Sequence, residues 1–137
     1  MDDADIGGED ACLVNQISDA FGEIARGDVT AVDLDASTFS GSGVAWSLPH
    51  GGDLDVNVVH LDANGTIERH VNDAVDVLVV VWSGGGRLDA GEIAVALHAG
   101  VLAHVRRGVA RSVSAGPNGL TYLSVHRRRE GLTIGRR

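Results

Sequence analysis

Alternating apolar and polar residues make up much of the chain after residue 28. Between residues 53 and 61, Leu54 and Val56 alternate with Asp55 and Asn57, which is the spacing of a strand that buries one face. Similar runs predict strands at 29–34, 44–48, 74–82, 92–97, 101–105, 110–114 and 120–126. Many short strands at near-regular spacing favour an antiparallel sandwich or barrel, so we expect an all-β jelly-roll barrel.

Turn signals separate these expected strands. The Asn-Gly pair within 62–65 readily adopts positive φ and predicts a turn there. The three glycines at 84–86 are followed by neither a Lys-Ser/Thr pair nor a helical pattern, so they predict a hairpin turn and not a phosphate-binding loop. Further turns are expected at 98–100, 106–108 and 115–119.

The first residues have a different, helical period. Asp10 is a suitable N-cap, and Gly27 follows the last turn of an expected helix over 11–27. The apolar residues at spacings of three and four are Leu13, Ile17, Phe21 and Ile24. The expected organisation is therefore an acidic segment with a short helix over 1–28 and a single barrel domain over 29–137.

Composition limits the class of protein. At 137 residues the chain is large enough for one domain with one core. The longest apolar run, 77–82, is too short to cross a bilayer, and the acidic opening lacks the basic and apolar segments of a secretory signal. The single Cys12 excludes an internal disulfide. These features predict a cytoplasmic protein with no membrane partner.

Charge is divided unevenly along the sequence. Residues 1–76 hold sixteen acidic residues and two arginines, a net charge of −14, whereas residues 77–137 hold nine arginines and three acidic residues, a net charge of +6. The Arg-rich tail 126–137 is the one candidate for nucleic-acid binding, and it lacks aromatic or helical reading elements. We therefore expect its arginines to pair with the acidic first half, with no nucleic-acid partner.

The segment 65–86, GTIERHVNDAVDVLVVVWSGGG, resembles the first signature of the cupin superfamily. That signature has two histidines separated by one residue and then a glutamate; here His70, Asn72 and Asp76 stand at those positions. The second signature corresponds to 106–111, where Gly108 matches and Arg111 replaces a histidine. The resemblance covers about residues 44 to 126 and implies a cupin barrel.

The resemblance also allows the metal-ligand positions of cupins to be compared with the residues of this chain. Metal-binding cupins direct three imidazoles and one carboxylate into the barrel. Here His70 and Asp76 are credible ligands, but Asn72 is a weak donor and the permanent charge of Arg111 repels a cation. We therefore expect no tightly bound metal and no cofactor.

Two roles are open for the same residues. Asp76 and Arg111 could form a buried ion pair with a structural role. Alternatively, Arg111 could bind a carboxylate, enolate or carbonyl oxygen while His70 acts as acid or base and Asn72 orients the group. The expected catalytic set is His70, Asp76 and Arg111.

The expected ligand-binding residues come from several strands. Trp82 alternates with Asp76 and is expected at the floor of the pocket, and His126 alternates with Tyr122 on one face of a strand. The complete expected set of ligand-binding residues is Asn57, Asn72, Trp82, Tyr122 and His126.

Three functions fit this reading. The first is a small cupin that binds a partly apolar organic molecule, as a cofactor-independent isomerase or cyclase of secondary metabolism. The second is a non-catalytic binding or sensor module. The third is a metal-dependent oxygenase or isomerase with a reduced ligand set. The sequence leaves open whether a reaction is catalysed, and the resemblance implies a homodimer.

Overall fold

The computed structural model describes residues 23–26, 29–36, 39–49 and 52–128. The chain divides into two compact units, Met1–Phe39 and Ser40–Arg137. This boundary lies later in the chain than the division after residue 28 that the sequence predicts. Each unit is described separately below.

Unit 1 contains a short antiparallel hairpin. Strand β1 (Glu23–Arg26) pairs with β2 (Val29–Val32), and the 3₁₀ turn η1 (Leu34–Ala36) follows. The end of the predicted helix over 11–27 is therefore wrong, because Glu23–Arg26 is a strand; residues 11–22 lie outside the described residues. The β-branched residues of β2 supply a pairing partner that overrides the helical spacing.

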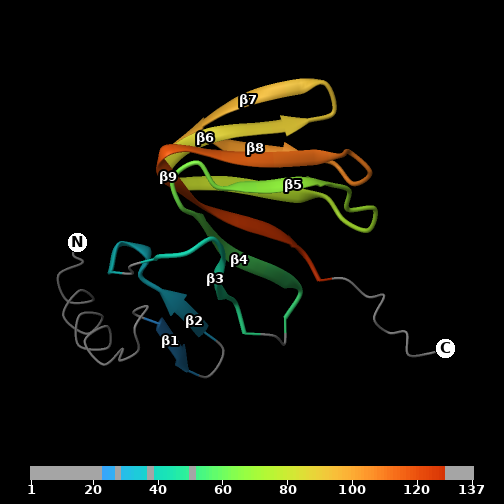
Figure 1. The fold of residues 1–137 in the computed structure, drawn as a ribbon. Coiled ribbons are helices and arrows are strands. Elements are labelled where there is room, and N and C mark those ends of the chain that lie inside the picture. The colour runs from blue at the N-terminus through green and yellow to red at the C-terminus, as the bar shows by residue number, and fades with distance from the viewer. Residues whose placement is uncertain (1–22, 27–28, 37–38, 50–51, 129–137) are drawn as a thin grey trace, which may run out of the picture. The chain divides into compact units, whose positions relative to one another are not determined.

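Unit 2 contains a seven-stranded antiparallel sheet in which β3, β4, β9, β6 and β7 are neighbours in that order (Figure 1). In addition, β5 pairs with β9 and β8 pairs with β6. The strands are β3 (Gly43–Ser47), β4 (Leu54–Leu61), β5 (Thr66–His70), β6 (Val77–Ala90), β7 (Ile93–His98), β8 (Leu102–Val105) and β9 (Arg111–Arg127).

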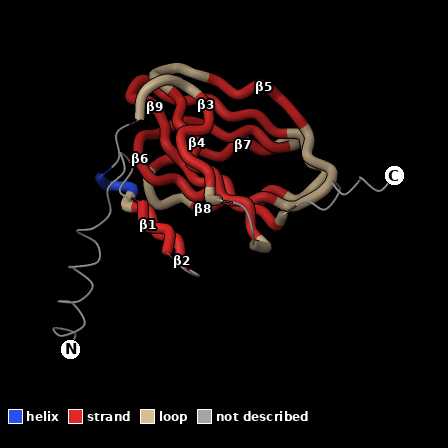
Figure 2. Tube along the Cα trace, turned by 90° about the horizontal axis from the view of Figure 1, so that it is seen from below, coloured by secondary structure: helices blue, strands red, loops and turns tan. Residues whose placement is uncertain are grey.

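The two long strands β6 and β9 run side by side for most of their length (Figures 1 and 2). The first half of β6 pairs with β8 and the second half with β7, while β9 pairs first with β5 and then with β4. Two layers result: β3, β4, β9, β6 and β8 in one, and β5, β9, β6 and β7 in the other. This is the all-β jelly-roll arrangement that the strand pattern predicts.

Glycines allow the two long strands to pass from one layer to the other. The predicted hairpin turn at 84–86 is wrong, because these residues continue β6, where the register with β9 shifts. A Cβ at Gly84 would overlap the carbonyl oxygen of Gly119, and a Cβ at Gly86 would overlap that of Ser114. The glycines are thus needed for close backbone approach inside a pair of strands.

Other boundaries differ in the same way. The predicted turn at 115–119 lies within β9, which joins two expected strands, and β5 falls in a segment where no strand is expected. The turn at 62–65 is confirmed: Asn64 has a φ of 62°, and the Gly65 N–H donates to the carbonyl of Asp62 at 2.8 Å.

The core lies between the two layers of unit 2. Val59, Val79 and Tyr122 from one layer pack in the same buried cluster as Leu88 and Val113 from the other. Among the described residues, no helix is long and apolar enough to span a membrane.

Candidate functional site

A cavity of about 190 Å³ lies inside unit 2, between the two layers. We call it the interior cavity. Its walls are mostly apolar and include Val59, Val79 and Leu88. Its polar lining residues are Asn57, His70, Arg111, Tyr122 and Ser124. The structure therefore brings together four residues that the sequence predicts for the site, namely Asn57, His70, Arg111 and Tyr122.

Arg111 is the charged residue of the interior cavity with the least exposure, 9%. It begins β9, and its Cα pairs with that of His70 across the β5–β9 ladder. Two neighbouring strands thus place a guanidinium and an imidazole on the same cavity. A guanidinium is always charged and carries only donors, so this end of the cavity favours an anionic or carbonyl oxygen.

His70 lies at the exposed edge of the interior cavity, at the end of β5. Its Nδ1 is 3.0 Å from the carbonyl oxygen of Glu68. A carbonyl can only accept a hydrogen bond, so Nδ1 carries the proton and donates it to Glu68. In the neutral ring, Nε2 is then the nitrogen that can accept a proton.

Tyr122 contributes a hydroxyl group from β9 and is 5% exposed. Burial raises the pKa of Tyr122 to about 12, and the positive charge of Arg111 opposes this rise. The phenol is therefore protonated at neutral pH and able to donate a hydrogen bond. Asn57 accepts a hydrogen bond from the Ser47 hydroxyl through its side-chain oxygen, which leaves its amide nitrogen as a donor.

Asn72 is buried but does not line the interior cavity. Its Oδ1 accepts hydrogen bonds from the N–H groups of Ala74 at 3.0 Å and Val75 at 3.3 Å. Its carbonyl accepts one from the N–H of Gly108 at 2.8 Å. Asn72 therefore holds two turns in place, a local role to which asparagine is suited.

Asp76 also lies outside the interior cavity. Its Oδ1 accepts a hydrogen bond from the N–H of Arg107 at 2.9 Å, and its Oδ2 is 3.0 Å from Nε2 of His104. The Arg107 bond and then the His104 bond lower the pKa of Asp76. The expected Asp76–Arg111 pair is thus not formed, because Val77 and not Asp76 occupies the inward-facing position at the start of β6.

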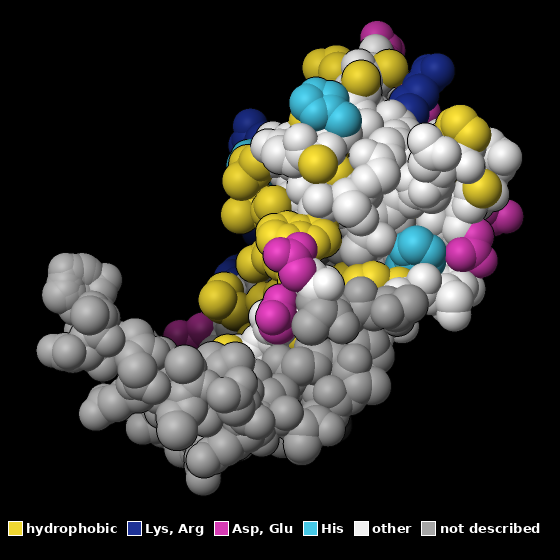
Figure 3. All heavy atoms as spheres, turned by 90° about the vertical axis from the view of Figure 1, so that its left-hand side faces the viewer, with side chains coloured by type: hydrophobic (Ala, Val, Ile, Leu, Met, Phe, Trp, Pro, Cys, Tyr) yellow, Lys and Arg dark blue, Asp and Glu magenta, His cyan; other side chains and the backbone are white. Residues whose placement is uncertain are grey.

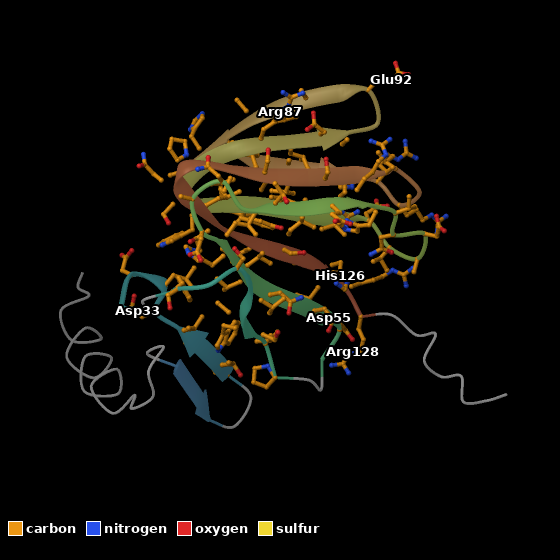
Figure 4. All side chains as sticks on the ribbon, viewed as in Figure 1. Asp33, Asp55, Arg87, Glu92, His126 and Arg128 are labelled. Atoms are coloured by element: carbon orange, nitrogen blue, oxygen red, sulfur yellow. The ribbon has the colours of Figure 1, made fainter. Side chains whose placement is uncertain are left out.

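Trp82 and His126 are the remaining predicted site residues, and neither lines the interior cavity. Trp82 is 41% exposed, one of several large apolar side chains on the surface; Figure 3 shows such side chains exposed on one face. His126 lies beside Asp55 of β4, with 3.9 Å between Nδ1 and Oδ2, and its Nδ1 donates to the carbonyl of Arg127 (Figure 4). Ser124 is the polar lining residue that the predicted set lacks, although it alternates with Tyr122.

The interior cavity does not fit the metal centre that the resemblance to cupins implies. Among its lining residues His70 is the one imidazole, there is no carboxylate, and Arg111 places a fixed positive charge beside it. Across the described part of the chain, no group of three or more His, Cys, Asp or Glu side chains is placed to hold a metal ion. Asn72 and Asp76, at two family ligand positions, are engaged with backbone groups elsewhere.

Comparison with known proteins identifies the fold. No protein-family model matches the sequence, and no curated protein matches it. Among solved structures, a conserved Klebsiella pneumoniae protein with a double-stranded β-helix domain matches with a TM-score of 0.58 and 24% identity, over 66% of this chain and 80% of that one. The chain has the cupin fold.

Two further structures agree. A cupin-2 domain protein from Shewanella frigidimarina has a TM-score of 0.57 and 16% identity, over 66% of this chain and 85% of that one. The cupin domain of Cnp3 from Schizosaccharomyces pombe has a TM-score of 0.57 and 14% identity, over 66% of this chain and 68% of that one. At these identities the likeness extends to the cupin fold alone, and function has to be argued from the site.

Proposed function

We propose that the interior cavity binds a small organic molecule with a carboxylate, enolate or carbonyl oxygen next to an apolar portion. The observation that carries the proposal is the position of Arg111, a 9% exposed cation on the wall of a largely apolar cavity. A guanidinium carries several fixed donors, and a ligand oxygen in the cavity would accept strong, charge-assisted hydrogen bonds from it.

The other polar groups support the same ligand chemistry. The Tyr122 hydroxyl and the Asn57 amide nitrogen are donors, like the guanidinium of Arg111. Donors that converge from different strands favour an acceptor-rich group on the ligand. The valine and leucine walls favour an apolar remainder.

The volume limits the size of the ligand. A cavity of about 150 Å³ in a protein interior can hold benzene, whereas drug-sized ligands occupy pockets of about 300–1,000 Å³. At about 190 Å³, the interior cavity suits a single ring or a short branched acid. This supports a small metabolite as the ligand, in preference to a nucleotide or a peptide.

Binding can be tested by calorimetry with benzoate, with benzyl alcohol as an uncharged probe of similar size. We expect the protein to bind benzoate and Arg111→Met to lose this binding while keeping a cooperative thermal transition. Arg69→Met is the matched control, because Arg69 is exposed on β5 next to His70 and does not line the cavity. Equal benzoate affinity in Arg111→Met and the parent protein would refute the proposal.

The second candidate is catalysis by proton transfer, as in a cofactor-independent isomerase or cyclase. It is favoured by the Nδ1–H bond of His70 to Glu68, which leaves Nε2 as the basic nitrogen at the edge of the same cavity. His70 would take a proton from the carbon next to the ligand carbonyl, and Arg111 and Tyr122 would stabilise the enolate oxygen. Return of the proton to another carbon completes an isomerisation.

Proton transfer predicts exchange with solvent. Small ketones and lactones incubated in heavy water should gain deuterium next to the carbonyl, and His70→Gln should abolish this gain without abolishing binding. His98→Gln is a suitable control, because His98 is exposed and its Nδ1 also contacts a backbone carbonyl, at 3.2 Å. Binding without exchange in the parent protein would leave the non-catalytic binding module as the function.

A further inference from the structure

Three arginines converge on a second, larger concavity on the surface of unit 2. Arg106 and Arg107 come from the turn between β8 and β9, and Arg127 ends β9. All three are exposed and line a concavity of about 640 Å³ that we call the arginine concavity. It lies apart from the interior cavity, with which it shares no lining residue.

The described residues that line the arginine concavity carry more positive than negative charge, namely three arginines and Asp76. No carboxylate among the described residues forms an ion pair with the guanidinium of Arg106, Arg107 or Arg127. Arg87, by contrast, pairs with Asp89, whose Oδ1 lies 2.9 Å from both Nε and Nη2 of the guanidinium. Three arginines beside one carboxylate leave a local excess of positive charge, which favours an anionic ligand.

Among the described residues that line the arginine concavity, Asp76 is the one carboxylate, and it already has two hydrogen-bond partners. Its Oδ1 accepts the N–H of Arg107 at 2.9 Å, and its Oδ2 lies 3.0 Å from Nε2 of His104. The lowered pKa of Asp76 agrees with these two contacts. Asp76 therefore anchors the backbone of the turn.

The turn that carries Arg106 and Arg107 is held by several hydrogen bonds. The N–H of Gly108, which has a φ of 84°, donates to the carbonyl of Asn72 at 2.8 Å. The N–H of Val109 donates to the backbone carbonyl of Arg106 at 3.2 Å. With the Asp76 bond, these contacts fix the backbone before any ligand arrives. Such preorganisation lowers the entropic cost of binding.

We propose that the arginine concavity binds a small molecule that carries a phosphate group. Planar guanidinium forks match phosphate oxygens bidentately, and several forks around one concavity suit a dianion better than a monoanion. The apolar side chains of Val75 and Val109 line the same concavity and give an organic portion a surface to contact. The volume lies within the range of small-molecule sites, so it accommodates more than a free ion.

The overall charge of the chain opposes non-specific binding of anions. The chain has a net charge of −8 at neutral pH, so its field as a whole repels anions. Saturable binding of a dianion would therefore require a local cationic site, either the arginine concavity or Arg111 in the interior cavity.

The test uses phenyl phosphate as the probe, at constant ionic strength and with the full chain. Benzoate is present in excess to occupy the interior cavity, so that binding there does not contribute. We expect saturable binding of phenyl phosphate at one site, about tenfold weaker in Arg106→Met and in Arg127→Met, and weaker again in the double variant. All three side chains are exposed, and the bond from Arg107 to Asp76 uses the backbone, so these variants should melt like the parent protein.

Arg87→Met is the control for diffuse charge. Arg87 lies where β6 pairs with β7, far across unit 2 from His126 near the end of β9 (Figure 4). An equal loss of phenyl phosphate binding in Arg87→Met and Arg106→Met would overturn the proposal, as would the absence of saturable binding. Tighter binding of a single-stranded oligonucleotide than of phenyl phosphate would also overturn it, because the arginines would then contact a nucleic-acid backbone.

Discussion

Tyr122 offers a direct test of whether its phenol is buried in the wall of the interior cavity. Burial raises the pKa of its phenol to about 12 from the ordinary value of 10.0. Tyr122 is the one tyrosine of the chain, which also has no lysine. Since cysteine titrates near pH 8.5 and arginine above about 12, Tyr122 is the side chain that titrates between pH 10 and 12.

The sign of the effect on stability follows from proton linkage. Between pH 10 and 12 the phenol keeps its proton in the folded protein and loses it in the unfolded chain. The stabilisation is therefore complete below pH 10 and is lost as the pH rises through the folded value of about 12. A shift of about two pKa units corresponds to about 3 kcal/mol in the free energy of unfolding, an upper value for this 5% exposed side chain.

Two measurements check this expectation. The near-ultraviolet absorbance of tyrosinate, followed against pH in the folded protein, reports the pKa of Tyr122 directly. Urea unfolding at several pH values between 10 and 12 reports the loss of stability, and Tyr122→Phe should remove most of the pH dependence in this window.

Arg111 provides an internal check on the same titration. Its positive charge lowers the pKa of Tyr122 against the effect of burial, so Arg111→Met should move the titration to still higher pH. Titration of folded Tyr122 near pH 10, with flat stability through the window, would refute the burial of its phenol, and an unchanged titration in Arg111→Met would refute the proximity of the two groups.

Three further predictions concern the framework of the site. Gly86→Ala should destabilise unit 2 by about 1–3 kcal/mol because its Cβ would overlap the Ser114 carbonyl, whereas Gly52→Ala, with nothing within 4 Å, should be near neutral in urea unfolding. Asn72→Ala should lower the free energy of unfolding by about 1–3 kcal/mol in the same measurement, since the N–H groups of Ala74 and Val75 that donate to its Oδ1 lose their acceptor. The lowered pKa of Asp76 predicts stabilisation above pH 3.8 that is lost at lower pH, and Asp76→Asn should flatten this acid dependence; an unchanged profile would contradict it.

The cupin fold could be predicted because its main determinants are local. A period of two in apolar residues identifies β4 and the second half of β9, and it places Tyr122 and Ser124 on one face. Asn-Gly at 64–65 specifies its turn through backbone sterics alone. The family positions also brought His70 and Arg111 into one site, where the structure pairs their strands.

Which face of β6 points inward could not be predicted. The run 77–82 is apolar at every position, so alternation does not distinguish its two faces. Packing against the opposite layer turns Val77 and Val79 inward, which leaves Asp76 and Trp82 outside the interior cavity. A shift of one residue in the inward-facing phase of β6 thus places the Asp76 carboxylate outside the predicted site, where it lines the arginine concavity.

Residue types and local spacing were enough to predict the fold class, most strand positions and the lack of a complete cupin ligand set at the family positions. Each of these depends on residue type or on neighbours in the chain. Tertiary structure decided where the glycines at 84–86 lie, since their role comes from backbone on β9 that is distant in sequence. It also decided that Arg106 and Arg107 meet Arg127 on one concavity. Contacts between strands far apart in the chain have no local signature, and they arise only when the two layers pack together.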